Sequence, residues 1–296
     1  MGYQKEKHLE HNDQCWCGSG KLYKDCHLEF DRKLATFRRN PKVEIPTRKM
    51  IKNQEQIDGI KEAAKINIAV LDYVAENIKE GMTTEDINTL VHTKTLELGG
   101  IPAPLNYEGF PKSVCTSVND VVCHGIPNRK QILRSGDIIN VDCTTIYKGY
   151  YADASRMFLI GKVSDEVKHF VEVVKESMDL VVKKLKPYQQ MGDLGYMINK
   201  YCTENGYSVV REIGGHGVGI DFHEDPFVSH VGKKGEGILF VPGMVFTIEP
   251  MVNMGKRYVF QDISDGWTIY TADHSLSAQW EYTVVMTEEG LEIIAY

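Results

Sequence analysis

The sequence lacks any run of 18 apolar residues, so it offers no segment of the length that a transmembrane helix needs. Residues 1–8 are polar where a secretory signal peptide would carry its apolar segment. Gly2 is followed by Glu6 at the place where a myristoylation signal has Ser or Thr, which argues against that lipid anchor. We therefore expect a cytoplasmic protein that makes no contact with a membrane.

Composition argues against several other classes of protein. With 42% hydrophobic and 25% charged residues among 296, the chain has the composition of a globular protein, not that of a disordered or collagen-like one. Its seven cysteines are an odd number in a chain without an export signal, which argues against a disulfide framework. A net charge of −7 argues against a protein that coats nucleic acid.

Charge is unevenly distributed between the N-terminal region and the remainder. Residues 1–49 hold 11 Lys or Arg against 7 Asp or Glu, whereas the remaining residues hold 23 basic and 34 acidic side chains. Such an asymmetry is typical of an appendage with its own partner. Residues 38–49 contain two prolines and five basic side chains without apolar periodicity, which predicts a linker. We therefore divide the chain into an arm (1–37), this linker (38–49) and a main domain (50–296).

Four potential metal ligands cluster within thirteen residues of the arm: Cys15, Cys17, Cys26 and His27. Tetrahedral zinc takes four ligands of these kinds, and a metal can stabilise a segment too small to build an apolar core. The Cys-x-Cys-Gly-Ser-Gly-Lys and Cys-His ends of the segment resemble the SEC-C motif. That resemblance implies one structural zinc ion on these four residues and a docking role near ribosomes or protein partners.

Apolar periodicity predicts two pairs of helices in the main domain. Apolar residues recur at intervals of three and four from 54 to 79, and the pattern resumes after Thr84 until Gly99 and Gly100 stop it. We expect Thr84 to cap the second helix. A matching pair follows, for which we expect Ser164 and Asp193 as the N-caps.

The two helix pairs belong to an internal repeat. Residues 135–142 can be laid on residues 242–249, which places Asp142 on Glu249 at an offset of 107 residues. The same offset carries Asp86 onto Asp193. This pattern indicates a duplication, in which each half has two helices followed by strands. The predicted fold class is α+β, with approximate two-fold symmetry.

Acidic residues occupy alternating, strand-like segments in both halves. If Lys148 and Gly149 form a two-residue hairpin turn, Asp153 faces Thr144. Asp142 and Asp153 are then diagonal neighbours on one face, with Cα atoms about 7–8 Å apart.

The second half contributes Glu249 and Glu281 from segments that contain no Lys or Arg. Four converging carboxylates would balance two divalent cations. Histidines flanked by glycine or other turn residues could join them: His124, His216 and His223.

From about residue 50 onward the chain resembles a type I methionine aminopeptidase. The resemblance is carried by residues 111–119 (PKSVCTSVN), 122–127 (VCHGIP), 215–219 (GHGVG), 247–251 (TIEPM) and 265–268 (DGWT). It implies the pita-bread fold. It also implies removal of the initiator methionine from nascent polypeptide N-termini when the second residue is small.

The resemblance also implies site roles. Asp142 would chelate one metal ion, Asp153 and Glu281 would bridge both, and His216 and Glu249 would complete the second. A hydroxide held between the ions would attack the scissile carbonyl. Carboxylate and imidazole ligands suit Co, Mn, Fe and Zn alike, so the identity of the ions stays open.

The same resemblance assigns the groups around the ions. Glu249 would accept the proton of the water, while His124 and His223 would hydrogen-bond the substrate amide and the oxyanion. The implied methionine pocket consists of Tyr107, Phe110, Cys115, Phe222 and Trp267. A monovalent cation, Na or K, is implied near Asn119, Val121 and Ser277. Glu108 departs from the pattern, because some relatives have His there, and its effect on the pocket stays open.

Two alternatives remain at this point. Aminopeptidase P and prolidase share the five ligands, but they usually carry a large N-terminal domain, whereas only about 50 residues precede the first helix here. A catalytically inactive relative would act as a binding module and would be marked by the loss of a ligand. All five ligands are present, so we favour an enzyme of the methionine type.

Overall fold

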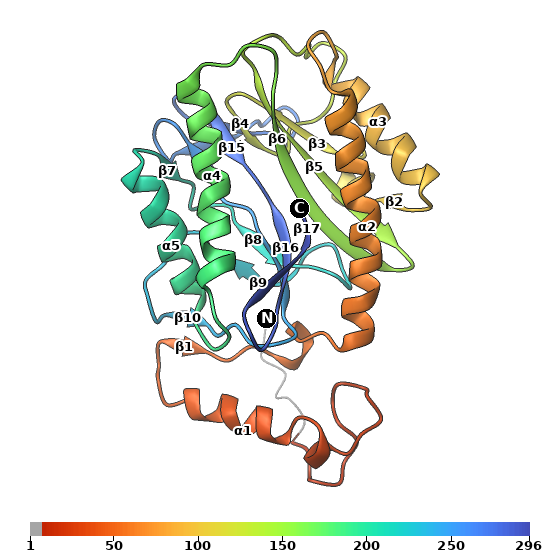
Figure 1. Cartoon of the computed structure of the whole chain (residues 1–296), viewed down its shortest axis with the longest axis vertical. Coiled ribbons are helices and arrows are strands. Elements are labelled where there is room, and N and C mark those ends of the chain that lie inside the picture. The colour runs from red at the N-terminus through yellow and green to blue at the C-terminus, as the bar shows by residue number, and fades with distance from the viewer. Residues whose placement is uncertain (1–7) are drawn as a thin grey trace.

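Two similar halves, each with helices on its outer side, make up the main domain of the protein. The structure is a computed structural model, and it describes residues 8–296. Helices α2 and α3 flank the strands on one side and α4 and α5 on the other, while the arm with α1 extends below them (Figure 1). No helix within residues 8–296 is long and apolar enough to cross a membrane. The prediction that the chain carries neither a signal peptide nor an acyl anchor rests on residues 1–8. Of these, only residue 8 is among the described residues.

The helices are α1 (Leu28–Phe37), α2 (Gln54–Asn77), α3 (Thr84–Glu97), α4 (Asp165–Lys184) and α5 (Met191–Glu204), with 3-10 turns η1 (Tyr23–Asp25), η2 (Arg48–Met50) and η3 (Tyr107–Gly109). The strands are β1 (Val43–Glu44), β2 (Ile101–Pro102), β3 (Cys115–Val118), β4 (Val121–Cys123), β5 (Ile138–Tyr147), β6 (Tyr150–Leu159), β7 (Ser208–Val209), β8 (Gly215–Gly217), β9 (Glu224–Val228), β10 (Gly237–Ile238), β11 (Val245–Ile248), β12 (Met251–Asn253), β13 (Val259–Gln261), β14 (Ile269–Thr271), β15 (Ser277–Gln279), β16 (Tyr282–Met286) and β17 (Leu291–Ala295).

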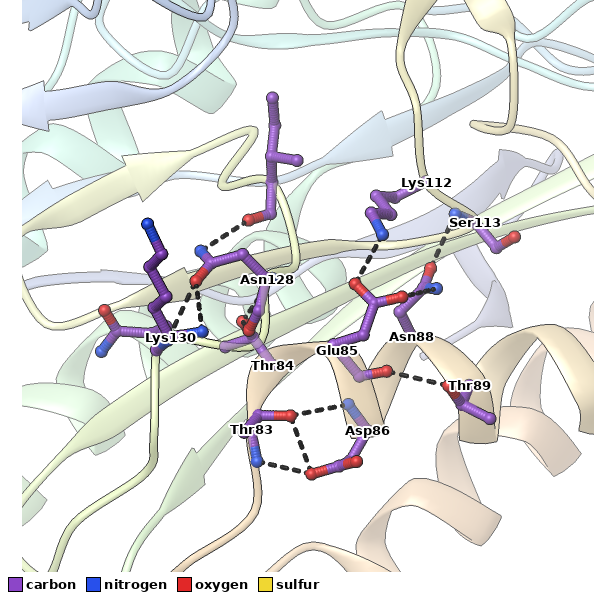
Figure 2. Close-up of polar contacts among 12 residues, drawn as sticks. Thr83, Thr84, Glu85, Asp86, Asn88, Thr89, Lys112, Ser113, Asn128 and Lys130 are labelled. Atoms are coloured by element: carbon purple, nitrogen blue, oxygen red, sulfur yellow. Dashed lines mark hydrogen bonds and ion pairs between the residues drawn. The ribbon is translucent and has the colours of Figure 1, made fainter.

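The predicted helices are present, but two of their caps differ from the prediction. Thr83, not Thr84, caps α3: its hydroxyl accepts the Asp86 amide at 3.2 Å, and the Asp86 carboxylate accepts the Thr83 amide at 2.8 Å (Figure 2). In α5 the N-cap is Gln190, and Asp193 accepts its amide at 2.9 Å. A carboxylate at the third helical position can close such a capping box, so both acids lie inside their helices. Asp86 and Asp193 thus occupy equivalent positions, as the duplication predicts.

The β5–β6 hairpin has the predicted register. Tyr147 pairs with Tyr150 and Thr144 pairs with Asp153 across the two strands. The turn residues Lys148 and Gly149 have φ of 50° and 83°, the left-handed geometry of a two-residue hairpin turn. This hairpin, with β2 and β3 alongside β5, is the sheet of the first half.

The second half has its own sheet, which meets the hairpin at the centre of the domain. Its strands lie in the order β17-β16-β11-β8-β9. The Glu281 amide donates to the Ser155 carbonyl at 3.2 Å, and the Thr283 hydroxyl donates to the Asp153 carbonyl at 2.7 Å. Asn140 reaches across to the Gln279 carbonyl at 2.7 Å. The two halves are therefore joined by hydrogen bonds beside the predicted acids.

Each half also has its own apolar core. In one core, α2 side chains such as Ile60 and Leu71 pack with Val141 of β5. In the other, Phe170 of α4 packs with Phe246 of β11. These side chains are fully buried, and burying each one favours folding by about 1.5–3 kcal/mol. Each core also takes in side chains of the other half, such as Val245 in the first and Ile138 in the second, so the acidic residues lie between halves that stabilise each other.

The segment predicted to be a linker contains regular structure. Val43 and Glu44 form β1, which pairs in parallel with Gly237 and Ile238 of β10. Just before it, the ring of Phe37 stacks on Tyr188, with ring centroids 6.0 Å apart. The free backbone groups of β10 offer these residues partners, so part of the predicted linker is paired with the main domain.

The capping box of α3 yields a stability test. Thr83→Ala removes the hydroxyl that accepts the Asp86 amide, so we expect the free energy of unfolding to fall by about 1 kcal/mol. Urea denaturation of both proteins measures this difference. Thr89→Ala, at an exposed position of the same helix, serves as the control. An equal loss of stability in both variants would argue against the cap.

Candidate metal centre

A cavity of about 680 Å³ opens between the two halves. All five predicted metal ligands line it: Asp142, Asp153, His216, Glu249 and Glu281. They come from separate elements, namely β5, β6, β8, the residue after β11, and the link between β15 and β16. The cavity is therefore built by both halves of the repeat.

The hairpin supplies Asp142 and Asp153 to one side of this cavity. Asp153 is 3% exposed, and its Oδ1 atom accepts a hydrogen bond from the Thr144 hydroxyl at 2.8 Å. Its other oxygen, Oδ2, lies 3.6 Å from Nε2 of His216. Nitrogen and oxygen atoms of Asp153, His216 and Glu281 all lie within 4.8 Å of one another, which is close enough to share an ion.

His216 presents one ring nitrogen to the carboxylates. Its Nδ1 atom lies 2.9 Å from the Gly217 carbonyl, which places the proton on Nδ1 and leaves the Nε2 lone pair free. Nε2 is 3.6 Å from Oε1 of Glu249. The Thr247 hydroxyl donates to the same Oε1 atom at 2.6 Å, and the Gln279 amide donates to Oε2 at 3.0 Å.

The electrostatics of the cavity favour a cationic ligand. Burial raises the pKa of Asp142 to about 7 and that of Glu249 to about 8. Burial and then the neighbouring carboxylates raise the pKa of Asp153 and of Glu281 well above their usual values. Within residues 8–296, no Lys or Arg lines this cavity. The donor set of four carboxylates and one unprotonated imidazole fits divalent cations, which would compensate the buried charge.

All the predicted pocket residues line the same cavity: Tyr107, Phe110, Cys115, Phe222 and Trp267. Their aromatic rings pack against one another, with Phe110 and Trp267 edge to face at 5.2 Å between centroids. The ring centroids of Tyr107 and Phe222 lie 4.7 Å apart. Glu108, the departure from the family pattern, also lines the cavity, so its carboxylate can influence what enters.

The two histidines that the family does not use as ligands lie beside this pocket. The backbone of His124 is left-handed, with a φ of 56°. The next residue is Gly125, and a Cβ atom at that position would lie 2.1 Å from the Thr116 carbonyl oxygen. Burial lowers the pKa of His124 to about 4, so its ring is neutral near pH 7. The Nδ1 atom of His223 lies 3.0 Å from the Tyr107 hydroxyl.

The first turn of α3 supports a wall of the pocket. Lys112 forms an ion pair with Glu85 at 2.5 Å, and the Ser113 amide donates to Asn88 at 2.9 Å (Figure 2). These two residues lie between Phe110 and Cys115 in the sequence. The segment that carries both pocket residues is thus tied to a helix.

Several residues that orient the acids were not singled out from the sequence. Thr247 and Gln279 lie two residues before Glu249 and Glu281, so strand alternation could have indicated that they share a face with those acids. His230 gives no such signal. Its Nε2 atom accepts the Glu249 amide at 3.1 Å, an arrangement that depends on the tertiary structure.

The residues predicted to hold a monovalent cation lie on neighbouring segments. The Ser277 amide donates to the Asn119 carbonyl at 2.9 Å, and Asn119 has a φ of 55°. Val121 lies in β4, which contacts β15. A monovalent cation bound by these residues remains a prediction.

The four residues of the arm form a second compact cluster: Cys15, Cys17, Cys26 and His27. The Cys15 and Cys26 sulfurs lie 3.2 Å and 3.1 Å from Nδ1 of His27. The Cys17 and Cys26 sulfurs are 3.6 Å apart. Zinc–ligand bonds of about 2.0–2.3 Å in tetrahedral geometry need spacings of this size between ligands. The cluster therefore fits one zinc ion.

Comparison with known proteins supports both parts of this description. The model of metallopeptidase family M24 matches residues 58–288, and the SEC-C motif matches residues 12–29. The chain is 45% identical over 247 residues to a methionine aminopeptidase of Buchnera aphidicola subsp. Schizaphis graminum, an alignment that covers 83% of this chain and 94% of that protein. It is 40% identical over 292 residues to a methionine aminopeptidase of Chlamydia trachomatis, covering 97% and 98%.

A structural match confirms the predicted pita-bread fold. The crystal structure of methionine aminopeptidase from Rickettsia prowazekii superposes with a TM-score of 0.81 at 41% identity, covering 83% of this chain and 99% of that one. Family, sequence and fold agree on a metal-dependent aminopeptidase. The chain belongs to the methionine aminopeptidases of metallopeptidase family M24, and it carries an N-terminal SEC-C motif.

Proposed function

We propose that this aminopeptidase removes the initiator methionine from nascent proteins whose second residue is small, with two divalent cations in the central cavity. The observation that carries the proposal is the convergence of three buried carboxylates, the half-buried Asp142 and the Nε2 atom of His216, in a cavity whose lining within residues 8–296 includes no Lys or Arg. The family resemblance supplies the substrate.

The five residues would share the ions as follows. Asp142 would help to hold one ion, His216 and Glu249 would help to hold the other, and Asp153 and Glu281 would contribute to binding both. When bound, the ions supply Lewis acidity, which polarises a carbonyl and makes a coordinated water acidic. Glu249 is the proposed proton acceptor, and the hydrogen bonds from Thr247 and Gln279 hold its carboxylate in place.

The remaining cavity residues would bind and orient the substrate. His124 and His223, which both line the cavity, would hydrogen-bond the scissile amide and the developing oxyanion. The aromatic wall and the Cys115 thiol form an apolar, polarisable slot of the kind that suits a methionine thioether.

The arm would serve a separate purpose. Its zinc-type cluster, together with the net positive charge of residues 1–49, supports binding to the ribosome, where cytoplasmic nascent chains emerge. Such a contact would bring the enzyme close to its substrates.

Substrate class and metal dependence can be tested together. We expect Met-Gly-X peptides to be cleaved after loading with Mn or Co, and X-Pro peptides to be left intact. A chelator should abolish cleavage, because the carboxylates lose their compensating charge. Equilibrium dialysis should find two ions per chain in addition to zinc. Rapid turnover of X-Pro peptides with inert Met-Gly-X would overturn the substrate assignment.

The role of His223 predicts a loss of rate without loss of metal. His223→Ala removes a donor to the oxyanion, so we expect kcat to fall by about 10²–10³-fold while the metal content stays at the wild-type value. His169→Ala, on the exposed face of α4, is the matched control. Steady-state kinetics with metal analysis decides the point, and unchanged kcat in His223→Ala would contradict the role.

Deletion of the arm should weaken ribosome binding without stopping catalysis. Deleting residues 1–37 leaves β1 in place, so we expect peptide cleavage to continue. Co-sedimentation with ribosomes should decrease, since the zinc-type cluster is gone. Unchanged co-sedimentation would exclude the arm as the docking element.

A further inference from the structure

The loop at residues 218–225 carries Phe222 and His223 into the candidate pocket and lies next to the N-terminal arm. Glu224, at its end, lines two cavities: the central one and a second of about 420 Å³. The second cavity is also lined by Trp16 and Cys17 of the arm. Glu224 is therefore placed where the arm, the main domain and the pocket meet.

Glu224 forms an ion pair with a buried lysine. The Nζ atom of Lys52 lies 2.5 Å from Oε2 of Glu224, and the two side chains are 2% and 14% exposed. Lysine is almost never this buried without a partner, because the desolvation of its ammonium must be offset. No role in catalysis or metal binding assigned above explains this pair.

The second oxygen of the same carboxylate closes the loop. Oε1 of Glu224 accepts the amides of Ile220 at 2.7 Å and of Asp221 at 3.1 Å. One carboxylate thus ties the end of the loop to its beginning, and the ammonium of Lys52 ties both to the main domain. Phe222 and His223 lie between these points of attachment.

Lys52 is itself held in a fixed position. Its amide donates to the Gly243 carbonyl at 2.8 Å. The next residue, Asn53, caps α2 by accepting the Gln56 amide at 2.9 Å. The side-chain amide of Asn53 also donates to the Cys17 carbonyl at 3.2 Å, within the zinc-type cluster.

The loop is also packed closely on α2. Gly219 has a φ of 134°, and a Cβ atom there would lie 2.3 Å from Cδ1 of Ile60. At the other side, His223 lies 3.0 Å from the Tyr107 hydroxyl, and its ring centroid is 4.3 Å from that of His216. A shift of the loop would therefore move groups that face the metal ligands.

We propose that Lys52 is a positioning residue for the substrate pocket, acting through Glu224 to hold the loop that presents Phe222 and His223. The effect on catalysis rests on the function proposed above. Without the ammonium, Glu224 would be a largely buried carboxylate without its cation, and the loop would rearrange to hydrate it. Displacement of a substrate-contacting group by about 1 Å can cost 10²-fold in rate.

The test compares two lysines of the same region. Lys52→Met keeps the length of the side chain and removes its charge. Lys61→Met makes the same change on α2, where Lys61 forms a half-exposed ion pair with Glu292 of β17. It serves as the matched control. Hydrogen exchange at the Ile220 and Asp221 amides should become at least about tenfold faster in Lys52→Met and stay unchanged in Lys61→Met.

Activity provides the second measurement. We expect kcat/KM for a Met-Gly-X peptide to fall by about 10–100-fold in Lys52→Met, with metal content unchanged. Glu224→Gln should cause a similar loss, and the double variant should be little worse than either single one, since both break the same contact. Glu224→Gln also keeps the test available if Lys52→Met does not fold.

Clear outcomes would overturn the inference. Wild-type exchange at both amides in Lys52→Met and in Glu224→Gln would show that the pair does not hold the loop. Faster exchange throughout the domain would indicate general destabilisation and would equally exclude a positioning role. Additive losses in the double variant would contradict action through Glu224. Failure of the wild type to cleave Met-Gly-X would refute the proposed function, whereas the exchange measurement would still decide the role of Lys52.

Discussion

The gathering of four carboxylates between the two halves, three of them buried and one half-buried, is the constraint on which the structure of the active-site region depends. Asp142, Asp153, Glu249 and Glu281 line one cavity whose described lining offers them no basic side chain. Burial raises the pKa of each group, and repulsion from neighbouring carboxylates raises the pKa of Asp153, Glu249 and Glu281 further. Such a set is compatible with a stable fold only when divalent cations compensate the charge or protons neutralise it.

The surrounding fold tolerates this arrangement because stability is generated elsewhere. Each half has its own apolar core, in which a long helix packs on strands. The two sheets then meet through short contacts, such as that between Thr283 and Asp153. Hydrogen bonds from Thr144, Thr247 and Gln279 orient the carboxylates before any ion binds.

The walls of the pocket are held in a similar way, by polar contacts from the starts of helices. Lys112 is paired with Glu85 in the first turn of α3, and Glu224 is paired with Lys52 just before α2. Loops of this kind carry the groups that we propose to contact the substrate, so their anchorage decides how well those groups are placed. The arm joins this system through Asn53, which links α2 to the carbonyl of Cys17.

Much of the fold and of the candidate site could be predicted from the sequence, because local rules govern them. Alternation and the Lys148–Gly149 turn determined the hairpin register that pairs Thr144 with Asp153, and spacing alone indicated the zinc-type cluster. Other features depended on tertiary structure. β1 forms only because β10 presents free backbone groups. The cap of α3, in contrast, follows from a local signal that the prediction missed, because Asp86 lies three residues after Thr83 and closes a capping box with it. The contacts of His230 with Glu249 and of Lys52 with Glu224 join residues far apart in the chain, and no local pattern encodes which distant charge or amide a buried side chain will meet.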